Sequence, residues 1–351
     1  MTTSPLRMLD AEQMRVLCAG VVPLPIEQSA QWDAFERSQG RRPWGRYVWS
    51  DEGKPCAVIA LDEYELRGAH YLWARHGPVW LREQTPLRAQ RFREDLAALV
   101  RRSDPNIVFI RLHAQFSAPD LHELLQSITY DRTVVVDTSG GDEASVLAGM
   151  TTDGRRAVRR ARARMETAGG EVVEETGLDA PAFHEYYAVL EATALRDGFR
   201  PHPEHVYTDL LAALGPDHAR LFGVRVAGRL VCWDLVLVND RRACAYYGAS
   251  SSDARAVLGP DALDFAIAVI LAGEGVTGFD LMGSHSPRVP QLYSVGRYKR
   301  RFAQHYTDVD GAWDLPTRPV LYAALHAALR AKTTLSRLRA AAARHAPVSR
   351  A

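Results

Sequence analysis

The feature that most constrains this chain is the regular alternation of turns, strands and one helix from Leu221 to Phe302. Two apolar strands around a turn at Ala227–Arg229 predict a β-hairpin, and a third strand follows it. An apolar helix is predicted from Asp261 to Gly273, and a short strand, Gly278–Gly283, comes after it. Strands that alternate first with turns and then with a helix predict a mixed α/β fold.

The first half of the chain shows the same order of predicted elements. When Gly53 is placed on Gly228, Tyr71 falls on Tyr246, and each half then continues into an amphipathic helix and a short strand. This weak repeat predicts two copies of one α/β unit with a cleft between them. The helices and strands expected in the first half are 11–20, 29–40, 46–49, 56–61, 69–73, 86–103, 106–112 and 133–137.

Breaks in composition divide the chain into three parts. A Ser-, Gly- and Asp-rich linker from Thr138 to Asp142 predicts a first domain of residues 1–140 and a second of residues 141–315. Residues 316–351 carry Lys and Arg but no Asp or Glu, which predicts a basic helical tail, with Pro319–Arg344 as one Ala-rich helix.

Charge and cysteine content limit the possible environments. The 351 residues carry a net charge of +1, so a basic surface has to be local. The four cysteines lack CxxC spacing and are interpreted as free thiols in a reducing cytoplasm, without a metal site. No apolar run is long enough to span a membrane, so we expect a cytoplasmic protein without a membrane span.

Several segments, taken in order, are similar to those of a known family. They are Thr133–Asp137 followed by the basic helix at Arg155–Ala161, the strand Tyr246–Ala249, the segment Gly275–Gly283 and the run Arg297–Phe302. In order and spacing the chain resembles the FemABX-like peptidyltransferases, which are twin-domain members of the GNAT acyltransferase superfamily. No heptad insert is present, so the resemblance is to the type without a coiled-coil arm.

This resemblance implies tandem GNAT-like domains that transfer an amino acid from aminoacyl-tRNA to an amine and form an amide by direct attack. The acceptor would be a peptide, a nucleoside-peptide antibiotic or a peptidoglycan precursor, and no metal or cofactor is expected beyond the co-substrate. Two alternatives remain: an acyl-CoA-dependent N-acyltransferase and a non-catalytic tRNA- or nucleotide-binding module. The sequence leaves the oligomeric state open.

Acetyl-CoA is the less favoured donor on chemical grounds. GNAT enzymes bind its pyrophosphate with backbone N–H groups in a glycine-rich loop at a helix N-terminus. The corresponding loop here, Arg255–Pro260, has a different spacing, and Pro260 has no N–H to donate.

Five residues are candidates for catalysis. The resemblance implies that Lys299 stabilises an oxyanion or phosphate, although a surface lysine is the simpler alternative. Tyr246 and Tyr247 are expected on opposite faces of one strand, so that one at most enters a given cleft. Asp234 lies in an apolar strand, where a carboxyl group must be paired or have a raised pKa that suits a general base. The simpler alternatives are a residue on an edge strand or one paired with an arginine. His285 follows a strand end and is a candidate base near neutral pH.

Other residues are candidates for substrate binding. Closely spaced arginines on one predicted helix suit bidentate contacts with phosphates, and with the basic tail they would form a track for tRNA, unless they are simply a solvated face. One acidic residue is expected to hold a loop through backbone N–H groups, and a serine follows the last short strand. These residues are Arg155, Arg156, Arg159, Arg160, Asp280 and Ser284.

Overall fold

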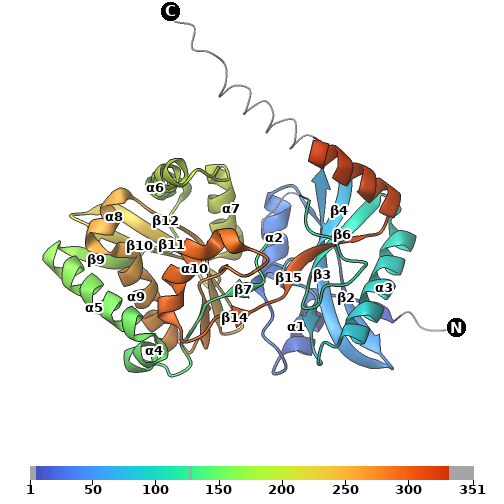
Figure 1. Ribbon diagram of the computed structural model, residues 1–351, viewed down its shortest axis with the longest axis horizontal. Helices are drawn as coiled ribbons and strands as arrows, with labels where there is room; N and C mark the ends of the chain where they lie inside the picture. Colours follow the sequence, from blue (N-terminus) through green and yellow to red (C-terminus); the bar gives the residue numbers. More distant parts are fainter. Residues whose placement is uncertain (1–4, 126–128, 332–351) are drawn as a thin grey trace, which may run out of the picture.

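The computed structural model describes residues 5–125 and 129–331 and contains two α/β units that lie side by side (Figure 1). The first unit is built on a seven-stranded sheet with the order β1-β2-β3-β4-β6-β15, in which β5 pairs with β3. Its strands are β1 (Leu6–Leu9), β2 (Arg42–Asp51), β3 (Lys54–Leu66), β4 (Ala69–Trp73), β5 (Val79–Trp80), β6 (Ile107–Ala114) and β15 (Gly311–Pro316). Its helices are α1 (Ala11–Cys18), the 3₁₀ turn η1 (Ile26–Gln28), α2 (Ala30–Ser38) and α3 (Pro86–Ser103).

The second unit is built on a six-stranded sheet with the order β8-β13-β12-β11-β10-β9. Its strands are β8 (Val135–Asp137), β9 (Gly170–Glu174), β10 (Ala219–Val226), β11 (Arg229–Asn239), β12 (Arg242–Ser250) and β13 (Gly278–Asp280). Its helices are α4 (Glu143–Gly149), α5 (Thr152–Thr167), α6 (Ala180–Asp197), α7 (Glu204–Leu214), α8 (Ser252–Val257), α9 (Gly259–Gly273), η2 (Pro290–Leu292), α10 (Tyr293–Lys299) and η3 (Arg300–Phe302).

Local sequence explains where the predicted helices begin. The Ser29 hydroxyl accepts a hydrogen bond from the Trp32 N–H at the start of α2, and Thr85 caps α3 ahead of Pro86. The amphipathic helix expected at residues 86–103 is α3, and it buries Phe92 and other residues about one turn apart against the first unit.

The internal repeat is confirmed by the topology. Strands β2, β3, β4 and β6 are arranged as β10, β11, β12 and β13 are: two antiparallel pairs followed by one parallel pair. Gly53 and Gly228 occupy equivalent hairpin turns, and both have a positive φ. Helices α3 and α9 connect the parallel strands of the two units.

Two strands, however, belong to the opposite sheet from the one that the sequence suggested. Residues 311–316 form β15, which pairs with β6 of the first sheet although residues 311–315 were assigned to the second domain. Conversely, β8 precedes the second unit and pairs with β13 there. A short ladder between β7 (Arg132–Thr133) and β14 (Thr307–Asp308) joins the two crossing segments. The predicted domain limits at 140 and 315 are therefore bridged by strand pairing.

The tail is described only in part. Residues 319–331 are helical, and Tyr322 and Leu329 are buried while Leu321 is exposed. The remainder of the predicted helix, including Leu335, lies outside the described residues. Within the described part of the chain, the helices are too short or too polar to cross a membrane.

Candidate functional site

The two units differ at one point of their parallel strand pairs. In the first unit β4 stays paired with β6 up to Trp73, which lies opposite Arg111. In the second unit the pairing of β12 with β13 ends at Cys244, opposite Asp280. The rest of β12 pairs only with β11 among the described strands, so a cleft opens beside it.

This opening, called the β12 cleft below, has a volume of about 350 Å³. It is bounded by β11, the free part of β12, the end of α6, the start of α9 and the end of α10. The end of α6 contributes the exposed ion pair of Arg196 and Asp197. The lining also contains two carboxyl groups, a phenol and a lysine, from Asp234, Asp264, Tyr298 and Lys299.

Asp234 and Asp264 form a hydrogen-bonded carboxyl pair in the β12 cleft. Burial and the neighbouring Asp264 raise the pKa of Asp234 well above its usual range. Burial raises the pKa of Asp264 to about 6. The two structural alternatives for Asp234, a place on an edge strand and pairing with an arginine, do not apply. Strand β11 is an interior strand, and no arginine pairs with this carboxyl group among the described residues.

Gly248 provides the space for this pair. It lies directly opposite Asp234 in the β11–β12 ladder, and a Cβ atom there would clash with the Asp234 carboxyl oxygen. The absence of a side chain at this position therefore lets the carboxyl group lie over β12 and reach the cleft.

Lys299 lies at the C-terminal end of α10 and points into the same site. Its Nζ donates hydrogen bonds to the carbonyl oxygens of Met282 and Gly283, at 2.7 and 3.2 Å. Burial lowers the Lys299 pKa, while the nearby Asp264 carboxylate acts in the opposite direction. With two of its three N–H groups used, one remains for a ligand.

Tyr298 connects α10 to the carboxyl pair. Its hydroxyl donates a 2.7 Å hydrogen bond to Asp264 Oδ2, and this bond lowers the Asp264 pKa relative to burial alone. The arrangement orders the two carboxyl groups by acidity, with Asp264 the more acidic.

The expectation that Tyr246 and Tyr247 lie on opposite faces of β12 is wrong. The register of β11 and β12 shifts so that Leu235 pairs with Tyr247 and Val236 with Ala245, which leaves Tyr246 as the extra residue of a β-bulge. The two rings consequently contact each other with centroids 5.1 Å apart.

Both tyrosines face the boundary between the units and not the β12 cleft. Tyr246 contacts Trp32 of α2, and Tyr247 contacts Tyr207 of α7. Figure 1 shows α2 and α7 next to each other at this boundary.

Asp280 has the loop-holding role that the sequence suggested. Its carboxylate accepts a 2.6 Å hydrogen bond from the Met282 N–H and another from the Thr133 hydroxyl. Burial raises its pKa. Ser284 and His285 pack instead against α10 at Gly296, and the His285 ring contacts Tyr293, so these two candidates lie outside the β12 cleft.

The predicted arginine cluster lies on α5. Arg155 donates hydrogen bonds to the Met150 carbonyl and the Thr152 hydroxyl, which makes it a local structural residue. Arg156, Arg159 and Arg160 are exposed and form no salt bridge with residues in the described ranges. The sequence thus located a cationic helix face but not the different role of Arg155.

Sequence reasoning missed Asp264, Tyr298 and Gly248. An available signal was the presence of Asp264 in a helix that is otherwise almost entirely apolar. Tyr298 lies next to Lys299 in a run that the sequence had already singled out. The described residues contain no group of three or more potential metal ligands.

Comparison with known proteins identifies the fold. A family model described as an acetyltransferase (GNAT) domain matches residues 152–300. No curated protein sequence matches the chain significantly. A solved structure of FemX superposes with a TM-score of 0.72 at 13% identity, covering 92% of this chain and 99% of that one.

Two further structures share the arrangement at low identity. The C-terminal domain of a putative lysylphosphatidylglycerol synthetase from Agrobacterium fabrum has a TM-score of 0.54 at 14% identity, covering 93% of this chain and 98% of its own. A tandem GNAT protein from the clavulanic acid biosynthesis pathway has a TM-score of 0.51 at 11% identity, covering 89% and 98%. The chain therefore has the tandem GNAT-like α/β fold expected from its sequence, which is an acyltransferase fold.

Proposed function

We propose that the chain is an aminoacyltransferase that moves an amino acid from aminoacyl-tRNA to an amine. The β12 cleft would receive the aminoacyl ester, and the amide would form by direct attack without an acyl-enzyme. The similarity to FemX in fold and the polar groups of the β12 cleft support this proposal.

The observation that carries the choice of donor is the N-terminus of α9. In a CoA-binding site this helix end would present free N–H groups to a pyrophosphate. Here Pro260 lacks an N–H, and Asp261 places a carboxylate in the first turn. Arg301 Nη1 donates a 3.2 Å hydrogen bond to the Asp261 carboxylate, so the position that would favour a bound anion is already occupied by this carboxylate.

A second observation favours a polyanionic donor. The exposed arginines of α5 extend beside this helix end, and the charge of Arg160 acts on Asp261. Unpaired guanidinium groups on one helix face suit the phosphates of a nucleic acid backbone.

The carboxyl pair can move the protons that the reaction requires. In this mechanism the pair carries one proton, held by Asp234 as the less acidic group, and Asp264 is ionised. The amine attacks the ester carbonyl carbon, and Lys299 stabilises the oxyanion. The new C–N bond forms, Asp264 takes the proton from nitrogen, the C–O bond to the ribose breaks, and Asp234 donates its proton to the ribose oxygen.

The direct test is transfer from radiolabelled aminoacyl-tRNA to a panel of amines, with acetyl-CoA as the competing donor. Lys299→Ala should lower the transfer rate by about 100-fold or more, the scale for loss of an oxyanion donor. Lys54→Ala, at the exposed start of β3, is the matched control and should leave the rate unchanged. Full activity of Lys299→Ala would remove this residue from the mechanism.

The second candidate is an acyl-CoA-dependent N-acyltransferase, favoured by the match of residues 152–300 to an acetyltransferase model. Transfer of acetyl groups from acetyl-CoA, with no transfer from aminoacyl-tRNA, would establish this second function. Binding of tRNA without any transfer would instead indicate a non-catalytic module.

A further inference from the structure

A separate cavity lies between the two units. It has a volume of about 190 Å³, enough for on the order of ten water molecules. The first unit contributes residues 23–27 and His76, and the second contributes the ends of β11, β12 and β13. This space, called the interunit cavity below, is lined mainly by apolar side chains and contains the carboxyl groups of Glu27 and Asp280.

Glu27 is the unusual member of this lining. Its side chain is 4% exposed, yet its carboxylate makes no hydrogen bond to any residue in the described ranges. The basic group beside it is the His76 imidazole, whose Nδ1 lies 3.9 Å from Glu27 Oε2, beyond hydrogen-bond distance. A buried carboxylate that accepts no hydrogen bond is costly in free energy. The site therefore favours a ligand that donates a hydrogen bond to it.

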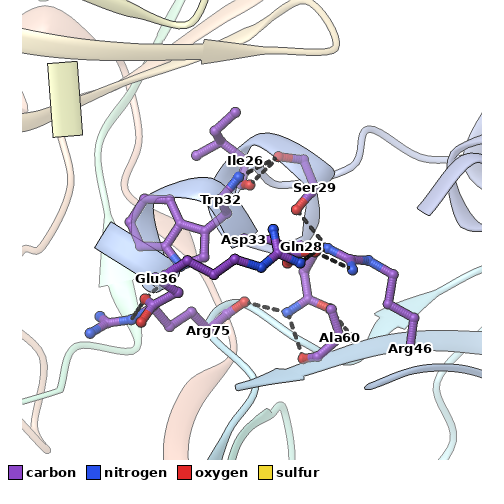
Figure 2. A network of polar contacts seen from close by, with 10 residues as sticks. Ile26, Gln28, Ser29, Trp32, Asp33, Glu36, Arg46, Ala60 and Arg75 are labelled. Carbon is purple, nitrogen blue, oxygen red and sulfur yellow. Dashed lines mark hydrogen bonds and ion pairs between the residues drawn. The ribbon is translucent and has the colours of Figure 1, made fainter. Parts of the chain in front are cut away.

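Glu27 is held in place by its neighbours and is not a product of loose packing. The side chain of Gln28 donates to the Ala60 and Arg75 carbonyls and accepts from the Ala60 N–H. Figure 2 shows these bonds, together with the Ser29 hydroxyl donating to the Ile26 carbonyl. The η1 turn that carries Glu27 is thus clamped to the first sheet.

The remaining charges of the interunit cavity do not neutralise Glu27. Asp280 adds a second carboxyl group, whose hydrogen bonds come from Thr133 and Met282. Arg242 lines the opening but is exposed and lies against the backbone of Gly278. The Glu27 carboxylate contributes, after burial, to raising the pKa of Tyr246.

The interunit cavity and the β12 cleft lie on opposite sides of one segment. Asp280 and Met282 line the cavity, while Leu281 between them lines the cleft. On the neighbouring strand, Cys244 lines the cavity and Ala245 lines the cleft. Only residues 280–282 and the neighbouring part of β12 therefore separate the two spaces, next to the point where β12 and β13 part.

We propose that the interunit cavity binds one ammonium group of a short aliphatic diamine, held by the Glu27 carboxylate and supported by Asp280. This inference rests on the proposed function, in which the diamine is the acceptor. Its second amine, uncharged, reaches past Cys244 and Ala245 to the donor ester in the β12 cleft. The apolar lining contacts the aliphatic chain between the two nitrogens.

The same lining disfavours an acceptor that carries phosphate in the cavity. Two carboxyl groups repel a phosphate at short range, and the one arginine among the lining residues is the exposed Arg242, which lies against Gly278. The geometry thus favours a small diamine over a nucleotide-linked precursor.

The test is calorimetric binding of 1,4-diaminobutane to the full chain without any tRNA. Glu27→Gln keeps the shape of the side chain and removes its charge, and should weaken binding roughly 30-fold or more. Glu94→Gln, on the exposed face of α3, is the matched control and should bind like the unaltered chain. 4-Amino-1-butanol carries the same single ammonium group and should bind with similar affinity, whereas phosphoethanolamine should bind much more weakly than the diamine.

Undiminished binding to Glu27→Gln, or no binding of the diamine to the unaltered chain, overturns the inference. Thermal melting of each variant checks its folding, and Glu27→Asp, which keeps the charge, should retain more affinity than Glu27→Gln. If diamine binding depends on Glu27 but the protein transfers no amino acid from aminoacyl-tRNA, the cation site is supported and the proposed donor is rejected. If Glu27→Gln transfers the amino acid to diamines with an unchanged KM for the diamine, the proposed function is supported and the cation site is rejected.

Discussion

Asp234 on β11 and Asp264 on α9 share a hydrogen bond between their carboxyl groups in the β12 cleft. The two residues come from different layers of the second unit and meet beside Lys299. Because burial raises the pKa of both groups, the pair retains one proton under conditions where isolated aspartates have none. A pair with one shared proton is suited to accepting and donating protons in a single reaction.

The Tyr298 hydroxyl should set the acid limb of the pH–rate profile. Its hydrogen bond lowers the pKa of Asp264, which stands at about 6. Tyr298→Phe should therefore move the acid limb of transfer to higher pH. Tyr293→Phe, on the exposed face of the same helix, should leave the limb in place. An unshifted limb in Tyr298→Phe would show that Asp264 does not act as the base.

The raised pKa of Asp264 should also appear in the stability of the fold. Since the folded state binds this proton more tightly, the stabilisation is complete below the ordinary value of 3.8 and is lost as pH rises through about 6. Over that window the free energy of unfolding should fall by up to about 3 kcal/mol through this group. Denaturant titrations at several pH values should show a weaker dependence in Asp264→Asn; an identical dependence would contradict the assignment.

Gly248→Ala should displace the carboxyl pair. The new Cβ would meet the Asp234 carboxyl oxygen and the Trp233 carbonyl, so we expect a loss of stability of about 1–3 kcal/mol and a large loss of transfer. Gly273→Ala makes the same change at the end of α9, where the Cβ meets open space, and should be neutral or slightly stabilising. Chemical denaturation and the transfer assay measure the two effects, and wild-type behaviour of Gly248→Ala would refute the packing argument.

The exchanged strand β15 should stabilise the first unit through a buried ion pair. The Asp314 carboxylate is fully buried and forms an ion pair with Arg111 of β6, whose Nε donates a 2.7 Å hydrogen bond to Asp314 Oδ1. Asp314→Ala leaves the buried guanidinium unpaired and should cost about 3–5 kcal/mol. Asp308→Ala breaks the exposed pair with Arg132 and should cost less than about 1 kcal/mol. Similar unfolding midpoints for the two variants would contradict this difference.

Local sequence was sufficient for most individual elements. Gly53 and Gly228 mark equivalent turns because glycine readily adopts a positive φ, and Ser29 and Pro86 mark helix starts because they meet the needs of the first turn. Tyr246 shows the limit of this reasoning: strand alternation predicts opposite faces, but a register shift that depends on the partner strand places both rings on one side.

The sequence by itself determined that the chain repeats one α/β unit, that helices begin after Ser29 and at Pro86, and that Asp234 is unusual for an apolar strand. These properties depend on residues close together in the chain. Only the tertiary structure decided that β15 joins the first sheet, that Asp264 and Tyr298 reach Asp234 and Lys299, and that Glu27 faces a cavity with Asp280. Such contacts join residues far apart in sequence, and local patterns carry no information on which of many possible long-range pairings gives the lowest free energy.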